Sequence, residues 1–165
     1  MDGGIIAICV IMVLITIAFT IGVYIYPARK KEQIREQING LASNTLEMSV
    51  AEFFKMRNYR TGRYKYSLGH NFTGVYILFN KTKNMYYIGQ ATQILNRVNG
   101  HFTGKRNGDV YADYKYGDEF TIKMIQLDKS GYCSLNELER NTIMTYDAFA
   151  HGYNKTRGNR QGLIK

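Results

Sequence analysis

The chain contains 165 residues, with 22 Lys or Arg against 13 Asp or Glu, which gives a formal net charge of +9 at neutral pH. Its two cysteines, Cys9 and Cys133, exclude a cysteine-rich metal cluster, and a disulfide between them is geometrically implausible because Cys9 lies in an apolar stretch. The excess of basic residues favours a polyanionic partner, although a basic domain can also simply be soluble.

Residues 3–26 contain no charged side chain and are dominated by Ile, Val, Leu, Ala and Phe. At about 1.5 Å per residue, a helix of this length spans a membrane hydrocarbon core of about 30 Å. A cleaved signal peptide would carry a basic segment before the apolar one, and here Asp2 is the only charge upstream. The stretch therefore predicts a transmembrane helix.

Basic residues follow this stretch immediately, at Arg29, Lys30, Lys31 and Arg35, and none precedes it. The positive-inside rule then places the short N-terminus outside and the rest of the chain in the cytoplasm. The sequence thus predicts a single-pass protein of the cell membrane.

The next segment, residues 28–70, is predicted to be a basic helical linker, with helices over about residues 29–41 and 45–57. The first helix carries an apolar stripe of Ile34, Ile38 and Leu41. This stripe fits either self-association, as in a homo-oligomer, or packing on the rest of the protein.

The end of the linker interleaves cations with aromatic residues, at Arg57, Tyr59, Arg60, Arg63, Tyr64, Lys65 and Tyr66. Such a composition suits a nucleic acid, through phosphate contacts and base stacking. It suits the anionic cytoplasmic surface of a membrane equally well.

Residues 72–79 and 85–89 are rich in aromatic and β-branched side chains and are separated by the polar run 80–83, which predicts a β-hairpin. With the polar run at the centre of the turn, Tyr76 falls opposite Tyr87. Directly opposed residues share a face of the sheet, with Cβ atoms about 5 Å apart. Two phenol groups are therefore expected side by side on a rigid element.

The segment from about residue 92 to 102 is predicted to be a helix, with its apolar residues on one arc. Arg97 and His101 are four residues apart, so they share a face that borders this arc and are expected near the tyrosines. The helix begins soon after Gly89, so its first backbone amides are expected to be free to bind an anion. The apolar residues are Ile94, Leu95, Val98 and Phe102.

A strand is predicted over residues 120–127, and Ser134 with Glu137 forms the capping-box pattern of a helix that runs to about residue 149. Counting about 100° per residue places Glu139 inside the apolar arc of this helix, whereas Glu137 faces solvent. A buried acid without a partner is costly, so Glu139 requires a cation. A metal ion is one candidate, and a buried Arg or Lys is another.

In order and spacing, these residues resemble the GIY-YIG nuclease family, in which two such tripeptides lie on adjacent strands and an arginine and a histidine follow on the next helix. The resemblance covers residues 71–159, and valine replaces the usual isoleucine of the first tripeptide. It implies an α/β (α+β) fold in which a small, mostly antiparallel three-stranded sheet is flanked by helices. The matching residues are Gly74-Val75-Tyr76, Tyr87-Ile88-Gly89, Arg97, His101, Asp113-Tyr114-Lys115-Tyr116-Gly117, Glu139 and Gly152-Tyr153-Asn154.

The resemblance also implies metal-dependent hydrolysis of phosphodiester bonds. Glu139 is expected to bind one Mg²⁺ or Mn²⁺, since Mg²⁺ commonly takes only one or two protein carboxylates. Arg97 is expected to hold the scissile phosphate through its planar guanidinium group. Asn154 is expected to help shape the site and position the phosphate.

Tyr76 is the general base that the resemblance implies, with Tyr87 and His101 orienting the water and the phosphate. A tyrosine hydroxyl has an ordinary pKa of about 10, and lowering it by two to three units needs roughly 3 to 4 kcal/mol, which Arg97 and a metal ion can supply. Alternatively, His101 accepts the proton, directly or through Tyr76.

These expectations divide the chain into a transmembrane anchor (residues 1–27), a basic linker (residues 28–70) and a nuclease domain (residues 71–165). The predicted function is a membrane-anchored endonuclease that cuts DNA at the cytoplasmic membrane face, with incoming foreign DNA, such as a phage genome, as its target. The alternative is a non-catalytic module that holds nucleic acid or a partner at the membrane.

Overall fold

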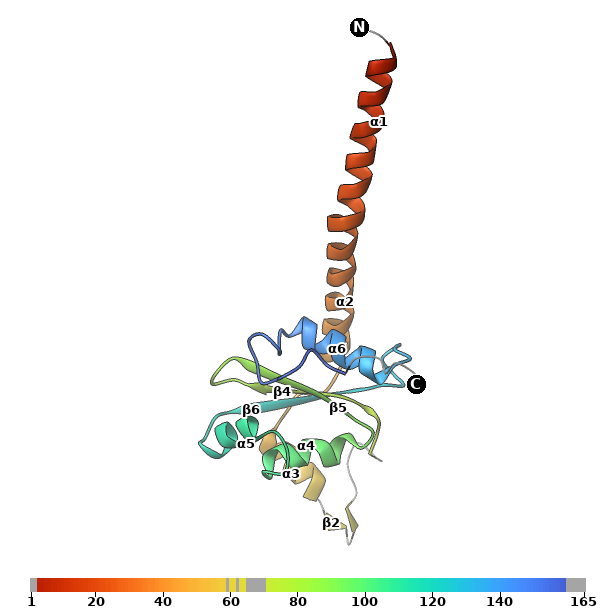
Figure 1. Ribbon diagram of the computed structural model, residues 1–165. Helices are drawn as coiled ribbons and strands as arrows, with labels where there is room; N and C mark the ends of the chain where they lie inside the picture. Colours follow the sequence, from red (N-terminus) through yellow and green to blue (C-terminus); the bar gives the residue numbers. More distant parts are fainter. Residues whose placement is uncertain (1–2, 59, 62, 65–70, 160–165) are drawn as a thin grey trace, which may run out of the picture. The chain divides into compact units, whose positions relative to one another are not determined.

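The structure is a computed structural model that describes residues 3–58, 60–61, 63–64 and 71–159 (Figure 1). The chain forms two compact units, Met1–Gln37 and Ile38–Lys165. Part of the basic aromatic stretch, namely Tyr59, Lys65 and Tyr66, lies outside the described residues, so the partner of that stretch stays a prediction.

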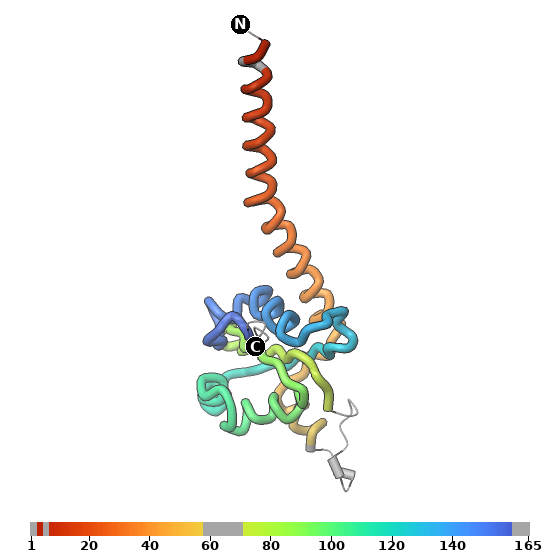
Figure 2. Tube along the Cα trace, turned by 45° about the vertical axis from the view of Figure 1, so that its right-hand side comes forward, coloured from red at the N-terminus to blue at the C-terminus, as the bar shows by residue number. Residues whose placement is uncertain are grey.

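The N-terminal helix is continuous from α1 (Gly3–Thr20) through a π-helical turn (Ile21–Ile25) into α2 (Tyr26–Ser43), as the red and orange trace of Figure 2 shows. Its part Ala7–Ser43 is long enough to cross a membrane and contains an 18-residue window with a mean hydropathy of 2.7. The Thr20 hydroxyl donates to the Thr16 carbonyl, so even this polar group is satisfied within the helix. Membrane spans and signal sequences share this length and composition.

The second unit is built on one antiparallel sheet with the strand order β1-β6-β4-β5. A separate two-stranded ladder joins β2 to β3. The mixed fold with an antiparallel sheet is confirmed, but the sheet has four strands rather than three. The strands are β1 (Met48–Ser49), β2 (Arg60–Thr61), β3 (Arg63–Tyr64), β4 (Gly74–Asn80), β5 (Met85–Ala91) and β6 (Phe120–Gln126).

The additional strand β1 comes from the predicted linker and pairs with residues 121–122 of β6. A strand of two residues is too short to show a period-two pattern in the sequence, and the prediction places it inside a helix. The helix α3 (Val50–Asn58) begins only after β1, because Ser49 and Glu52 form a capping box. The Glu52 carboxylate accepts from the Ser49 backbone N–H at 2.7 Å, and the Ser49 hydroxyl accepts from the Glu52 N–H at 3.2 Å.

The hairpin β4–β5 has a different register from the predicted one, with Tyr76 opposite Gly89 and Tyr87 opposite Leu78. The predicted opposition of Tyr76 and Tyr87 is wrong by two residues, because the turn lies between Asn80 and Met85 and closes through Asn84 in the left-handed region (φ 53°). A shift of two residues leaves side chains on their original face. The two tyrosine rings therefore still meet, with centroids 6.1 Å apart.

Helices cover both faces of the sheet (Figures 1 and 2). One face, with Tyr76, Leu78 and Ile122, packs against α3, α4 (Ile94–Phe102) and α5 (Gly108–Lys115). The predicted apolar arc of α4 is buried in this core: Ile94, Leu95, Val98 and Phe102. The opposite face, which carries Val75, Ile77 and Ile88, lies under α6 (Leu135–Thr145).

The helix α6 begins as predicted, since the Ser134 hydroxyl accepts from the Glu137 backbone N–H at 3.4 Å. It ends at Thr145, four residues before the predicted position. Asp147 adopts a left-handed conformation (φ 50°), which stops the helix.

Candidate active site

Tyr76 and Gly89 form a steric pair across the hairpin. Tyr76 is 1% exposed and lies directly opposite Gly89 in the β4–β5 register. A Cβ atom at Gly89 would overlap the Tyr76 hydroxyl group. Position 89, the last of the second tripeptide, must therefore be glycine. Only then can Tyr76, the last residue of the first tripeptide, lie across β5.

The tyrosines and the histidine that the sequence singles out lie together. The Tyr76 hydroxyl and His101 Nε2 are 2.8 Å apart, within hydrogen-bond distance. The His101 ring also lies next to the Tyr87 ring, with centroids 4.8 Å apart. His101 is 1% exposed, and its Nδ1 has no hydrogen-bond partner among the described residues.

Burial keeps these rings neutral. It raises the pKa of Tyr76 well above the ordinary 10.0, an effect that Tyr87 strengthens and Arg97 opposes. It also raises the pKa of Tyr87. Burial, with the nearby charges of Arg97 and Arg106, lowers the pKa of His101 from 6.5 to about 4. A tyrosinate base therefore has to be generated against the environment that the folded protein provides.

A basic pocket of about 370 Å³ opens beside these rings. No described acidic side chain forms an ion pair with Arg97 or Arg106, whereas Lys155 pairs with Asp109 at 2.9 Å. Unpaired guanidinium groups favour a phosphate ligand. The pocket is lined by Tyr87, Arg97, His101, Arg106, Asn107, Gly108 and Lys155.

Glu139 approaches from α6, which packs on the other face of the sheet. It is 8% exposed, and its Oε2 accepts from Gln90 Nε2 at 3.1 Å and from the Asn159 backbone N–H at 3.4 Å. It lines a pocket of about 220 Å³ that shares three lining residues with the basic pocket, so the two pockets adjoin along β5, an edge strand of the sheet. The shared residues are Tyr87, Asn107 and Lys155.

The surroundings of Glu139 fit a hard cation. Burial raises the pKa of its carboxyl group, while hydrogen bonds from Asn159 and Gln90 and the charge of Arg97 act in the opposite direction. Within the described ranges, no Lys or Arg forms an ion pair with Glu139, and no group of three His, Cys, Asp or Glu side chains gathers elsewhere. One carboxylate suits Mg²⁺, which completes its coordination with water and phosphate oxygens.

The first two amides of α4 are not free for an anion, so this expectation is wrong for both of them. The Ile94 N–H donates to the Phe72 carbonyl at 3.1 Å, and the Leu95 N–H donates to Asn71 Oδ1 at 2.9 Å. These bonds fix the start of α4 against the segment that enters β4. The pocket thus relies on side-chain cations.

Asn154 binds the outer edge of β5. Its Oδ1 accepts from the Ile88 N–H and its Nδ2 donates to the Ile88 carbonyl, both at 2.8 Å. The carboxamide therefore satisfies both backbone groups of the middle residue of the second tripeptide. The role of Asn154 in shaping the site and positioning a phosphate stays a prediction.

A buried polar network, which the sequence does not reveal, anchors the loop that carries Asn154. Fully buried Asn80 donates to the Tyr153 hydroxyl at 2.7 Å, and that hydroxyl donates to Asp113 at 2.6 Å. Arg106 and Lys155 are also unpredicted members of the site. The available signals were the cations at 105–106 and a glycine, Gly100, inside a helix.

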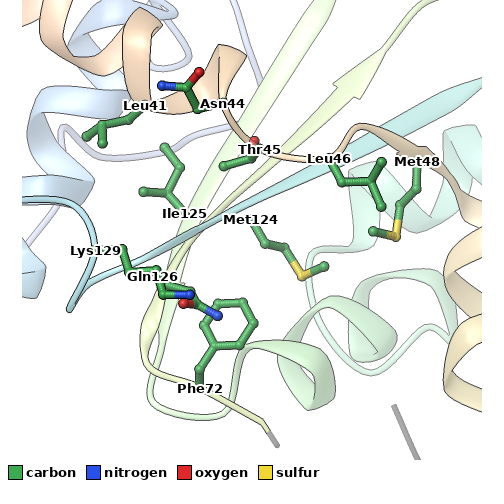
Figure 3. Close-up of a pocket in the computed structure, with 10 residues that line it drawn as sticks. All are labelled: Leu41, Asn44, Thr45, Leu46, Met48, Phe72, Met124, Ile125, Gln126 and Lys129. Atoms are coloured by element: carbon green, nitrogen blue, oxygen red, sulfur yellow. The ribbon is translucent and has the colours of Figure 1, made fainter. Parts of the chain in front are cut away.

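A mainly apolar groove of about 330 Å³ contains none of the predicted site residues (Figure 3). Phe72, Met124 and Met48 are among its lining side chains. The chemistry-bearing residues gather instead along β5.

Comparison with known proteins adds one finding. Residues 72–154 match the family model described as the GIY-YIG catalytic domain. No curated protein and no solved structure matches the chain.

Proposed function

The chain belongs to the GIY-YIG family, and from this premise we propose that it is a membrane-anchored endonuclease that hydrolyses DNA phosphodiester bonds with Mg²⁺ or Mn²⁺. The observation that carries the proposal is the meeting of Arg97, His101 and Glu139 at adjoining pockets along β5, with buried Tyr76 within hydrogen-bond distance of His101. Hydrogen-bonded Tyr76 and His101 lie beside Arg97, and Glu139 lines the neighbouring pocket. Together they offer a proton acceptor, a phosphate ligand and a metal ligand.

Arg97 binds the scissile phosphate and stabilises the charge that grows on its oxygens. Glu139 is the residue that would hold Mg²⁺ or Mn²⁺, whose chemistry would be neutralisation of charge on the phosphoryl and leaving oxygens. The lack of a protein cation paired with Glu139 in the described ranges supports this assignment.

The proton of the attacking water passes to the Tyr76 hydroxyl oxygen while the Tyr76 proton passes to His101 Nε2. The Tyr76–His101 distance of 2.8 Å supports this relay, and the raised pKa of Tyr76 disfavours a resting tyrosinate. Arg97 and Arg106 lower the pKa of His101 in the free protein. A bound phosphate offsets these charges, so the substrate itself makes His101 a better base.

The apolar helix is the membrane anchor, with the N-terminus outside and the nuclease domain in the cytoplasm. All Lys and Arg residues lie beyond residue 26, which supports this orientation. In the proposed arrangement, residues 1–27 anchor the chain, residues 28–70 link it and residues 71–165 cut DNA. Tethering raises the local concentration of the enzyme where incoming foreign DNA crosses the membrane.

The test is incubation of the full-length protein in detergent with plasmid, linear duplex and RNA, in Mg²⁺ and in chelator. Arg97→Ala and Glu139→Ala should each reduce the cleavage rate by about 100-fold or more, because each removes a group that acts on the transition state. Glu137→Gln serves as the matched control, since this half-buried acid lies on the same helix and lines neither pocket.

Undiminished cutting by both alanine variants would refute the mechanism. DNA binding by the wild-type protein without cleavage in any metal would favour the alternative, a non-catalytic module that holds nucleic acid at the membrane.

A further inference from the structure

Arg106 is a cation of the basic pocket to which the proposed mechanism gives no contact with substrate. It lines the pocket with Arg97, and no described acidic residue forms an ion pair with it. Lys155, by contrast, is already paired with Asp109. The pocket therefore holds two guanidinium groups that form no ion pair with any acidic side chain in the part of the chain that the structure describes.

Gly100 sets the path of the Arg106 side chain. A Cβ atom at Gly100 would lie 2.7 Å from Arg106 Cγ and 3.4 Å from its Nε, so the arginine crosses α4 where a side chain is missing. Glycine is the poorest helix former after proline, and Gly100 is interior to α4. Its lack of a side chain lets Arg106 lie against the helix that carries Arg97 and His101.

The positive charge of Arg106 acts to lower the pKa values of His101 and Tyr87. Two neighbouring guanidinium groups repel each other, and each can engage two oxygens of a phosphate. A phosphodiester carries one negative charge, so a single one cannot neutralise both arginines.

We propose that Arg106 binds the phosphate next to the scissile phosphate, so that the substrate is a strand with at least two successive phosphodiesters. The proposal rests on the nuclease function and deepens it. Arg97 binds the phosphate that is cut, and Arg106 binds its neighbour and fixes the register of the strand.

The test is steady-state cleavage of a linear duplex by the full-length protein in detergent with Mg²⁺, over a range of salt concentrations. Arg106→Ala should raise KM about tenfold, the value of one charge-assisted hydrogen bond, and should not lower kcat, because removing this charge makes His101 a better base. The slope of log KM against log salt concentration should fall by about one.

Two further variants make the result specific. Gly100→Ala adds one methyl group in the path of Arg106, so it should raise KM in the same direction without lowering the unfolding temperature. Lys105→Ala removes the adjacent exposed cation, which does not line the pocket, and should leave KM and the salt slope unchanged.

An equal effect of Lys105→Ala, an unchanged KM in Arg106→Ala, or a loss that falls mainly on kcat would overturn the proposal. Binding of a labelled duplex in chelator, followed by fluorescence anisotropy, separates it from the nuclease function. Suppose that the wild-type protein shows no cleavage, whereas Arg106→Ala weakens duplex binding about tenfold. The proposed hydrolase activity is then wrong, and the proposed phosphate site is supported.

Discussion

The Tyr76–His101 pair is held neutral by the burial of both side chains, which moves their two pKa values in opposite directions. Burial raises the pKa of Tyr76, and burial with two nearby arginines lowers the pKa of His101 to about 4. Neither group is charged near neutral pH, so the pair contains no ionised base in the free protein. In the proposed mechanism, activity then depends on a substrate phosphate entering the basic pocket.

The lowered pKa of His101 predicts a pH-dependent stability. Below the ordinary pKa of 6.5, His101 of the unfolded chain is protonated, whereas His101 of the folded protein stays neutral down to about pH 4. The folded state therefore loses stability as the pH falls through this window. Between pH 7 and pH 5 the loss should be about 2 kcal/mol.

Urea unfolding of the wild-type protein and of His101→Gln at pH 7 and pH 5 measures this loss. The wild-type protein should lose about 2 kcal/mol more than the variant, because all other titrating groups are common to both. Parallel pH dependences would show that His101 binds its proton normally in the folded state.

The sequence was sufficient to name the residues that come together at the candidate site, because tripeptide spacing and helical angles are local properties. Tyr76, Tyr87, Arg97 and His101 needed only a hairpin and one helix to be brought together. The direction of the tyrosine pKa shift was not accessible, since it depends on burial by distant elements. Arg106 escaped prediction because its position depends on the missing side chain of Gly100.

At the scale of elements, β5 is an edge strand of the sheet, whose outer backbone groups need partners. The loop after α6 provides them: the Tyr153 N–H donates to the Tyr86 carbonyl at 2.9 Å, and Asn154 binds both backbone groups of Ile88. The Asn154 side chain, which we call the side-chain clamp, bonds to Ile88 in the way that one residue of a neighbouring strand would. It also covers the edge against pairing with another chain.

Asn154→Ala should therefore destabilise the fold by about 1–3 kcal/mol, because it leaves the Ile88 N–H and carbonyl without their partners. Thermal unfolding gives the free energy, and hydrogen exchange of the Ile88 amide should accelerate. Asn96→Ala is the matched control, since exposed Asn96 bonds only to the Gln93 side chain among the described residues and should cost less than about 0.5 kcal/mol. Equal effects of the two changes would contradict the clamp.

Elements with a long periodic pattern were predictable, and those fixed by a single residue or a tertiary pairing were not. The hairpin, α4 and the start of α6 follow from alternation, an apolar arc and a cap. The register depended on Asn84, and the end of α6 depended on Asp147, each in a left-handed conformation that a pattern does not reveal. Strand β1 exists only because β6 lies beside it.

At the scale of the whole molecule, the unit Ile38–Lys165 contains the entire sheet and its covering helices. A fragment with these bounds should fold without the apolar helix and unfold within a few degrees of the full-length protein in detergent, because no core residue is removed. Circular dichroism of both proteins makes the comparison. A fragment that binds hydrophobic dyes and unfolds without cooperativity would show that residues 1–37 complete the core.

Strand β1 gives the protein a mechanical property. The covalent path from the apolar helix to the catalytic sheet runs through α2, whose Ile38 and Ala42 are buried, and then through Met48 and Ser49, which are bonded to β6. If the N-terminus were anchored and a substrate strand were bound at β5, tension along the chain would act on the short β1–β6 ladder. It would do so before it reached the long β4–β5 ladder. A pull of this kind would separate β1 from β6 first and leave the residues of the candidate active site in place.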